Sequence, residues 1–185
     1  MSGVTLVGYR GCGKTTVARL VSRRLGLPLI DADDVLEARA GRSIAAVIAA
    51  RGEAAFRDLE SEVLAEVLAG PPVVLATGGG VVLRQDNRAR LRSSVRPVVW
   101  LRAAAGVIRS RLAADPTTMS RRPGLTGADP LAEVADALAA RESLYSEVAD
   151  IAFDTSSDPP EGVAERIVEW LDAGRLSDPA AESAS

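Results

Sequence analysis

The stretch GYRGCGKT at residues 8–15 decides the fold class of this chain. It matches the pattern G-x-x-x-x-G-K-[ST] in full, and it lies between an apolar run at residues 4–7 and a helical pattern at residues 14–25. Glycines let backbone N–H groups turn inward around phosphate oxygens, and the following helix adds its N-terminal partial charge. Lys14 then reaches the β- and γ-phosphates of a nucleotide, and the Thr15 hydroxyl ligates Mg²⁺. The stretch therefore predicts a P-loop for ATP and magnesium.

Lys14 is the only lysine among the 22 lysine and arginine residues of the chain. A chain that uses arginine everywhere else indicates that this position needs a compact ammonium rather than a planar guanidinium. As a charge at a loop tip, Lys14 is expected to add little to the core. Cys12 lies in the same loop, where we interpret it as a small filler residue. A reactive thiolate is the alternative for Cys12, because it precedes a helix N-terminus.

Absent residue types narrow the chemistry and the location. The chain has no histidine, so acid–base work falls to Asp, Glu or Lys, and nearly all zinc sites are excluded. Its single cysteine allows no internal disulfide, which fits a reducing cytoplasm. The net charge of −3 argues against a nucleic-acid-binding surface. No apolar run approaches the ~20 residues of a membrane helix, and the N-terminus lacks a signal-peptide pattern. We expect a cytoplasmic monomer that binds neither nucleic acid nor membrane.

Short apolar runs alternate with helical patterns along the chain. Strands are expected at residues 4–7, 29–30, 73–76, 98–101 and 151–153. Helices are expected at residues 14–25, 35–39, 44–50, 53–68, 103–112, 130–145 and 161–171. This alternation predicts a three-layer α/β fold, in which helices cover both faces of a five-stranded parallel sheet. The length fits one domain at residues 1–175, followed by a disordered tail at 176–185. Ligands of such folds bind beyond the carboxyl ends of the strands.

Carboxylates follow the second expected strand, at the same edge of the sheet as the P-loop. Asp31 and Asp33 are two residues apart, so in an extended chain their side chains point the same way. The third strand ends in Thr77-Gly78 and lacks the aspartate that many P-loop proteins carry there, so Asp31 and Asp33 are interpreted as its substitutes. This arrangement favours a small-molecule kinase over a GTPase or a motor ATPase. Asp33 or Asp34 could alternatively cap the next helix.

Arginines and glycines supply further candidates for binding a phosphoryl acceptor. Gly78, Gly79 and Gly80 follow a buried strand, where glycines give backbone donors and close approach to a ligand; a plain tight turn is the alternative. Arg57 lies on the expected helix at residues 53–68, and Arg141 lies near the end of the helix at 130–145. On their own, both arginines would more often be surface residues than ligands of an anion.

Residues 115–129 contain several glycine and proline breaks and are expected to form a mobile loop. Arg121-Arg122-Pro123 lies within it. Arginines on a mobile segment near a phosphate site fit a closing lid that neutralises the transferring charge. A solvated basic loop is the alternative, and the sequence leaves open whether Arg121 or Arg122 is the main lid arginine.

Taken together, these motifs resemble shikimate kinase in their order and spacing. The motifs are residues 8–16, Asp31-Ala32-Asp33, Phe56-Arg57, Gly78-Gly79-Gly80, Arg122-Pro123 and Arg141-x-x-Leu144-Tyr145. The resemblance covers residues 4 to 171. It implies a P-loop fold like that of the nucleoside monophosphate kinases. It also implies ATP-dependent phosphorylation of the 3-hydroxyl of shikimate, in the pathway to chorismate and the aromatic amino acids.

The resemblance further implies roles for individual residues. ATP would be bound by Gly11, Cys12, Gly13, Lys14, Thr15, Thr16 and Arg122. Magnesium would be held by Thr15 and by Asp31. Shikimate would be bound by Asp33, Arg57, Gly79, Gly80 and Arg141. Lys14, Asp33 and Arg122 are implied as catalytic, with Asp33 at the acceptor hydroxyls, while Arg57 and Arg141 grip the carboxylate.

Some features depart from the commonest form of the family. Cys12 stands where serine is usual, and the lid segment at about residues 113–129 is long. The adenine side matches only weakly, at Arg109 or Arg111 and in the loop at residues 155–158.

Three alternatives to shikimate kinase remain on the sequence alone. The nearest is another small-acceptor kinase of the same fold, such as a gluconate kinase. A nucleoside monophosphate kinase should show more residues that read a second base. A non-catalytic nucleotide-binding relative would have no reason to keep Lys14, Asp33 and Arg122.

Overall fold

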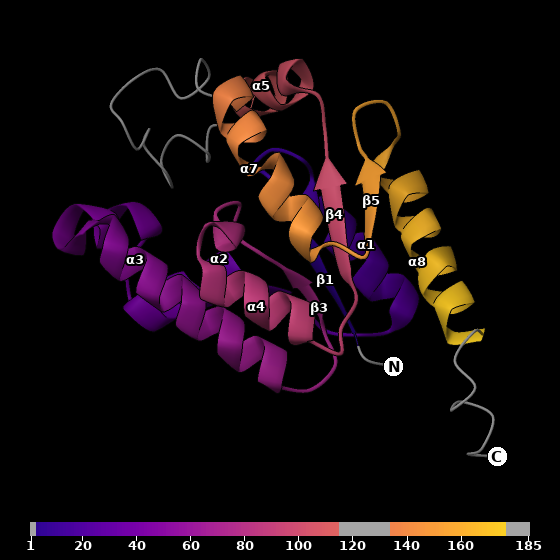
Figure 1. Ribbon diagram of the computed structural model, residues 1–185, viewed down its shortest axis with the longest axis horizontal. Helices are drawn as coiled ribbons and strands as arrows, with labels where there is room; N and C mark the ends of the chain where they lie inside the picture. The colour runs from indigo at the N-terminus through magenta and orange to yellow at the C-terminus, as the bar shows by residue number, and fades with distance from the viewer. Residues whose placement is uncertain (1–2, 115–133, 177–185) are drawn as a thin grey trace.

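The structure is a computed structural model that describes residues 3–114 and 134–176. In this part of the chain, strands form one sheet in the order β2-β3-β1-β4-β5, and all neighbouring pairs are parallel. The strands are β1 (Val4–Val7), β2 (Leu29–Asp31), β3 (Val74–Ala76), β4 (Val98–Arg102) and β5 (Ile151–Asp154). The five-stranded parallel sheet expected from the sequence is confirmed (Figure 1).

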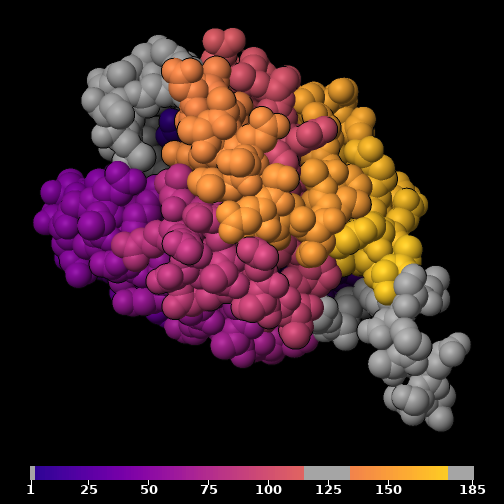
Figure 2. Space-filling view, viewed as in Figure 1, coloured from indigo at the N-terminus to yellow at the C-terminus, as the bar shows by residue number. Residues whose placement is uncertain are grey.

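Helices connect the strands and lie on both faces of the sheet (Figure 1). They are α1 (Lys14–Leu25), α2 (Ala32–Ala40), α3 (Ile44–Ala69), the 3-10 helix η1 (Val81–Leu83), α4 (Gln85–Ser93), α5 (Ala105–Ala114), α7 (Val134–Val148) and α8 (Pro160–Leu176). Helices α3, α4 and α7 pack side by side on the face shown in Figure 2. Residues 115–129 of the expected lid, which include Arg121 and Arg122, lie outside the described residues, as do residues 177–185 of the expected tail.

Two hydrophobic cores, one on each face of the sheet, produce the three layers. In β1, Val4 and Leu6 point into the core formed with α1 and α8, whereas Val7 points into the core formed with α2, α3, α4 and α7. Because successive side chains of a strand point to opposite faces, a strand buried on both sides must be apolar at nearly every position. This explains why the strands read as continuous apolar runs.

Local signals define several helix ends. Helix α1 spans the expected residues and ends at Gly26, which has a φ of 65° and donates its N–H to the carbonyl of Ser22. Ser43 begins α3, because its hydroxyl accepts a hydrogen bond from the N–H of Ala46. Gly52, with φ 81° and ψ 166°, interrupts α3. The two helices expected at residues 44–50 and 53–68 are therefore the two parts of one kinked helix.

The structure differs from the sequence-based elements at α2, at residues 81–93 and at the ends of α7 and α8, which reach Val148 and Leu176 instead of the expected residues 145 and 171. Helix α2 begins at Ala32, directly after β2, rather than at residue 35. Residues 81–93, to which the sequence analysis assigned no element, form η1 and α4. Within α4 only Asn87 and Leu91 are buried, so this helix has almost no apolar periodicity to reveal it.

Candidate active site

The loop between β1 and α1 has the backbone geometry of a phosphate cradle. Gly8, Gly11 and Gly13 take positive φ angles of 144°, 79° and 90°, which residues with a Cβ rarely adopt. Position 8 also has no room for a side chain, because a Cβ there would lie 2.2 Å from the carbonyl oxygen of Leu101. Gly13 is the N-cap of α1 and no side chain caps that end, so the N–H groups of the first turn are left for an anion. The loop therefore fits the phosphates of a nucleotide.

Lys14 lies within this loop rather than at an exposed tip. Its ammonium donates hydrogen bonds to the carbonyl oxygens of Gly8 and Tyr9 at 2.9 and 3.0 Å, and the residue is only 8% exposed. The ammonium thus stabilises the loop itself, which the expectation of a loop-tip charge did not include. In this position the positive charge of Lys14 also lies beside the phosphate cradle, where the P-loop motif places a lysine for the β- and γ-phosphates.

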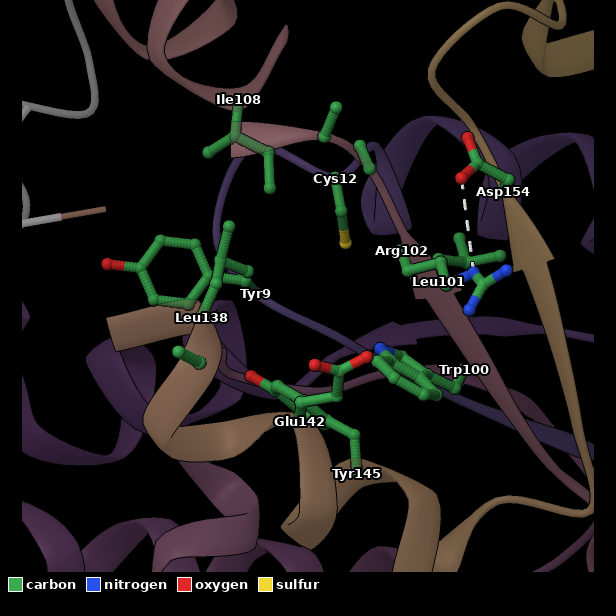
Figure 3. Close-up of a pocket in the computed structure, with 13 residues that line it drawn as sticks. Tyr9, Cys12, Trp100, Leu101, Arg102, Ile108, Leu138, Glu142, Tyr145 and Asp154 are labelled. Carbon is green, nitrogen blue, oxygen red and sulfur yellow. Dashed lines mark ion pairs between the residues drawn. The ribbon is translucent and has the colours of Figure 1, made fainter. Parts of the chain in front are cut away.

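Cys12 points into a pocket behind the loop and is fully buried (Figure 3). Its carbonyl oxygen accepts a hydrogen bond from the Thr155 hydroxyl at 3.0 Å, which ties the loop to the end of β5. A Cβ on Gly8 would lie only 2.8 Å from the Cys12 sulfur, so the thiol fills a tightly packed space. These contacts favour the filler interpretation of Cys12 over a reactive thiolate.

Thr15 and Asp31, the expected magnesium ligands, lie next to each other. The Thr15 hydroxyl donates to Oδ2 of Asp31 at 2.8 Å. Burial raises the pKa of Asp31 above its usual 3.8, although the hydrogen bond from Thr15 opposes the rise. Among the described residues no group of three His, Cys, Asp or Glu side chains could hold a metal alone. Mg²⁺ would fit here with Thr15, Asp31, water and phosphate oxygens as ligands.

Asp33 does not lie on an extended chain, so the structure corrects the argument that placed it beside Asp31. It is in the first turn of α2, where its N–H donates to Oδ1 of Asp31 at 3.0 Å. Asp31 is therefore the N-cap of α2, a role that the sequence analysis considered only as an alternative for Asp33 or Asp34. All three carboxylates still lie at the carboxyl end of β2, because the helix begins there. The first turn of a helix is also a favourable place for negative charge.

Arg57 is buried and held by acids, contrary to the surface salt bridge that its sequence context favoured. It is 8% exposed, and its guanidinium contacts Glu60 at 2.7 Å and Glu53 at 3.1 Å. The guanidinium also lies over the Phe56 ring, 4.7 Å from its centroid. Burial alone would lower the pKa of Arg57, but the two carboxylates raise it, so the charge is retained. A Cβ on Gly80 would lie 2.1 Å from Nη1 of Arg57, which places the guanidinium against that glycine.

Arg141 reaches the same glycine turn from α7. Its Nη1 donates to the carbonyl oxygen of Gly79 at 3.3 Å, and the Tyr145 hydroxyl donates to the same oxygen at 2.5 Å. Arg57 from α3 and Arg141 from α7 thus converge on Gly79–Gly80, directly after β3. The expected juxtaposition of Arg57, Gly79, Gly80 and Arg141 is therefore present, and β3 lies beside β1, which leads into the P-loop.

Two contacts near the P-loop were only weakly indicated by the sequence. Arg111 donates to the carbonyl oxygen of Gly11 at 3.4 Å and to that of Thr155 at 2.5 Å. This selects Arg111 over Arg109 as the neighbour of the loop. A lone arginine on α5 and a threonine after β5 carry no motif, so only the fold could bring them together.

A separate pocket of about 350 Å³ lies between the P-loop, the end of β4, α5 and α7 (Figure 3). Of the predicted site residues, only Cys12 lines it, so it is neither the phosphate cradle nor the acceptor site. The rings of Trp100 and Tyr145 stack in its wall, with centroids 5.7 Å apart and an interplanar angle of 19°. Tyr145 therefore stands between this pocket and the acceptor site, where its hydroxyl contacts Gly79.

The sequence of this chain is similar to those of known shikimate kinases. The family model for shikimate kinase matches residues 10–172. A shikimate kinase from Rhodopirellula baltica is 47% identical over 151 residues, which cover 82% of this chain and 80% of the relative. Another, from Oleidesulfovibrio alaskensis, is 43% identical over 173 residues, which cover 94% of this chain and 99% of the relative. This chain belongs to the shikimate kinase family.

A solved structure agrees with this assignment. The shikimate kinase from Acinetobacter baumannii in complex with shikimate is similar with a TM-score of 0.88 and 32% identity, and the match covers 96% of each chain. The expected P-loop α/β fold is confirmed, and the chain is a phosphotransferase of the shikimate kinase family that uses ATP with Mg²⁺. The family assignment decides against the gluconate kinase and the nucleoside monophosphate kinase.

Proposed function

We propose that this chain transfers the γ-phosphoryl group of ATP to the 3-hydroxyl of shikimate, on the pathway to chorismate and the aromatic amino acids. One observation carries the proposal. Arg57 and Arg141, from two separate helices, converge on Gly79–Gly80 beside the P-loop. Two guanidiniums that can bind one carboxylate, next to a phosphate cradle, suit an acidic acceptor whose hydroxyl must face the nucleotide.

The residues of the chain divide the work as follows. The backbone of residues 11–16 and the Lys14 ammonium bind and orient the phosphates of ATP. Thr15 and Asp31 hold Mg²⁺, which neutralises charge on the phosphates when bound. Asp33 accepts the proton or a hydrogen bond of the attacking hydroxyl. Gly80 leaves room for the Arg57 guanidinium against the turn, since a side chain there would occupy the same place.

Arg122 is proposed as the arginine that neutralises the transferring phosphoryl group. The proposal rests on the sequence, because residue 122 lies outside the described residues. Arg122→Ala should lower turnover by up to ~10³-fold, judging from arginine fingers in other phosphotransferases. Arg121→Ala is the matched control, and a larger loss in that variant would move the role to Arg121.

A coupled assay of ADP release with and without shikimate tests the proposed reaction. ADP release should require shikimate, and the product should be the 3-phosphate. Asp33→Asn should lose about 10²- to 10⁴-fold in turnover while it folds normally. Asp34→Asn is the control, because Asp34 shares the first turn of α2 but is exposed. Equal losses in both variants would remove Asp33 from the reaction.

The location and the oligomeric state of the chain are further parts of the proposal. We propose a cytoplasmic monomer that binds no nucleic acid. No helix in the described part of the chain is long and apolar enough to cross a membrane. Light scattering during size-exclusion chromatography would measure the molecular mass, and a dimer mass would contradict this proposal.

A further inference from the structure

The two arginines of the acceptor site, Arg57 and Arg141, differ in how many acidic side chains neutralise their charge. Arg57 lies between the carboxylates of Glu53 and Glu60, so its charge is largely neutralised before an acceptor arrives. Arg141 forms no ion pair within the described residues, where its guanidinium contacts the Gly79 carbonyl and the Tyr9 ring. An anionic acceptor therefore meets more unbalanced positive charge at Arg141 than at Arg57.

Arg10, in the P-loop, is a second arginine for which the described residues supply no counter-charge. It forms no ion pair with any residue of the ranges 3–114 and 134–176. The residue is half-buried, and its Nε atom is buried with no hydrogen-bond partner in the described part of the chain. Buried donors in folded proteins are almost always paired, and an unpaired one costs free energy. A ligand that brings an acceptor to the Arg10 guanidinium would remove that cost.

The position of Arg10 places it on the acceptor side of the P-loop. A Cβ on Gly79 would lie 2.8 Å from the backbone nitrogen of Arg10, so the two residues are in direct contact. The Tyr9 ring has Cζ of Arg10 at 5.8 Å and Cζ of Arg141 at 5.2 Å from its centroid. Two guanidiniums that have no counter-charge among the described residues thus share one aromatic ring at the edge of the acceptor site.

We infer that Arg10 is a third arginine of the acceptor site, where it binds the carboxylate of the acceptor together with Arg141. The inference rests on the proposed function. Arg57, fixed by two carboxylates, orients the acceptor, whereas Arg10 and Arg141 supply the net charge that attracts and holds it. The P-loop pattern leaves the residue at position 10 free, so the phosphate cradle does not require an arginine there.

Binding of shikimate and of ATP to three variants tests the inference. Arg10→Met removes the charge and keeps an unbranched side chain, while Arg10→Lys keeps the charge without the planar fork. Arg24→Met is the control, because Arg24 is an exposed arginine in the last turn of α1, far from the P-loop. Calorimetry would measure both affinities in a salt series from about 50 to 300 mM, and thermal unfolding would verify the fold.

We expect Arg10→Met to weaken shikimate binding about 10- to 100-fold, with ATP affinity unchanged, because one charge-assisted contact is lost. Its shikimate affinity should also depend less on salt than that of the parent. Arg10→Lys should recover part of the affinity, and Arg24→Met should match the parent. Unchanged shikimate affinity and salt dependence in Arg10→Met would overturn the inference, as would a loss confined to ATP. A parent protein that does not phosphorylate shikimate would instead refute the proposed function.

Discussion

Replacing Tyr145 by phenylalanine isolates the contact that joins α7 to the acceptor site. The Tyr145 hydroxyl donates to the carbonyl oxygen of Gly79 at 2.5 Å. The side chain is 1% exposed, and burial raises the pKa of Tyr145, so the hydroxyl keeps its proton and remains a donor at neutral pH. The substitution removes one oxygen atom and keeps the ring that stacks on Trp100.

The expected loss of stability in Tyr145→Phe depends on the hydrogen bonds that the Gly79 carbonyl oxygen retains. Its carbonyl oxygen would retain the hydrogen bond from Arg141, which is longer at 3.3 Å. A buried hydrogen bond contributes about 0.5–1.5 kcal/mol net, and a poorly satisfied carbonyl adds to the loss, so we expect about 1–2 kcal/mol of destabilisation. For a domain of this size, that lowers the melting temperature by about 2–8 °C. A looser Gly79–Gly80 turn should also raise the KM for shikimate by about 3- to 10-fold.

Thermal unfolding and steady-state kinetics with each substrate varied would measure both effects. The matched control is Tyr9→Phe, which removes the same atom from a side chain that is 4% exposed and whose hydroxyl has no hydrogen bond to a described residue. The KM for ATP should stay constant in Tyr145→Phe, because the P-loop is intact. Equal KM values for shikimate in the parent and in Tyr145→Phe would refute the reasoning, as would equal destabilisation by the two substitutions.

Further predictions concern the cradle, the acids around Arg57, and the metal site. Lys14→Arg should abolish phosphoryl transfer, whereas Lys14→Ala should abolish it and also lower stability by about 1–2 kcal/mol in urea unfolding, since two loop carbonyls lose their donor. Glu60→Gln should lower stability by about 1–3 kcal/mol and weaken shikimate binding, because Glu60 is 4% exposed and its carboxylate holds Arg57. Glu53→Gln, with a side chain 45% exposed, should cost at most about 1 kcal/mol, and the opposite ranking would contradict the assignment. Asp31→Asn should abolish Mg²⁺-dependent activity yet raise stability near neutral pH in the absence of magnesium, because a raised carboxyl pKa means that ionisation opposes folding. That gain should disappear as the pH falls from the raised pKa to below 3.8, where the carboxyl is neutral in both states, and thermal unfolding across the acid range would detect it.

Features that depend on a short stretch of chain were predictable from the sequence. The apolar run, the glycine-rich loop and the closing Gly26 define β1, the cradle and α1, and the structure has both elements at the expected residues. Each of these signals acts within a few residues, through burial, backbone conformation or helix capping. Asp33 shows where such reasoning fails. Its spacing from Asp31 suits an extended chain, but the Asp31 carboxylate caps α2, and the helix begins at Ala32 rather than at the expected residue 35.

Features that depend on distant elements were not predictable from local patterns. Arg57 on its own resembled a surface residue, and its burial results from Glu60 on the same helix and Gly80 after β3. The family resemblance singled out Arg57, but it gave no reason for the burial. Similarly, Arg111 and Thr155 contact the P-loop only because β4 and β5 end beside it. Residues of this kind acquire their contacts through the fold, so a local sequence pattern indicates them only weakly.

The glycines after β3 combine a local sequence signal with contacts to distant elements. They are needed because a side chain would not fit there, not because the backbone takes an unusual conformation. Gly80 has a φ of −106°, which any residue can adopt, yet a Cβ there would lie 2.1 Å from Arg57. A Cβ on Gly79 would lie 2.8 Å from the backbone of Arg10. The turn therefore lets a P-loop residue and an α3 arginine approach each other across two residues that have no side chains. Donor and acceptor must be close for in-line transfer, and the missing side chains make that closeness possible.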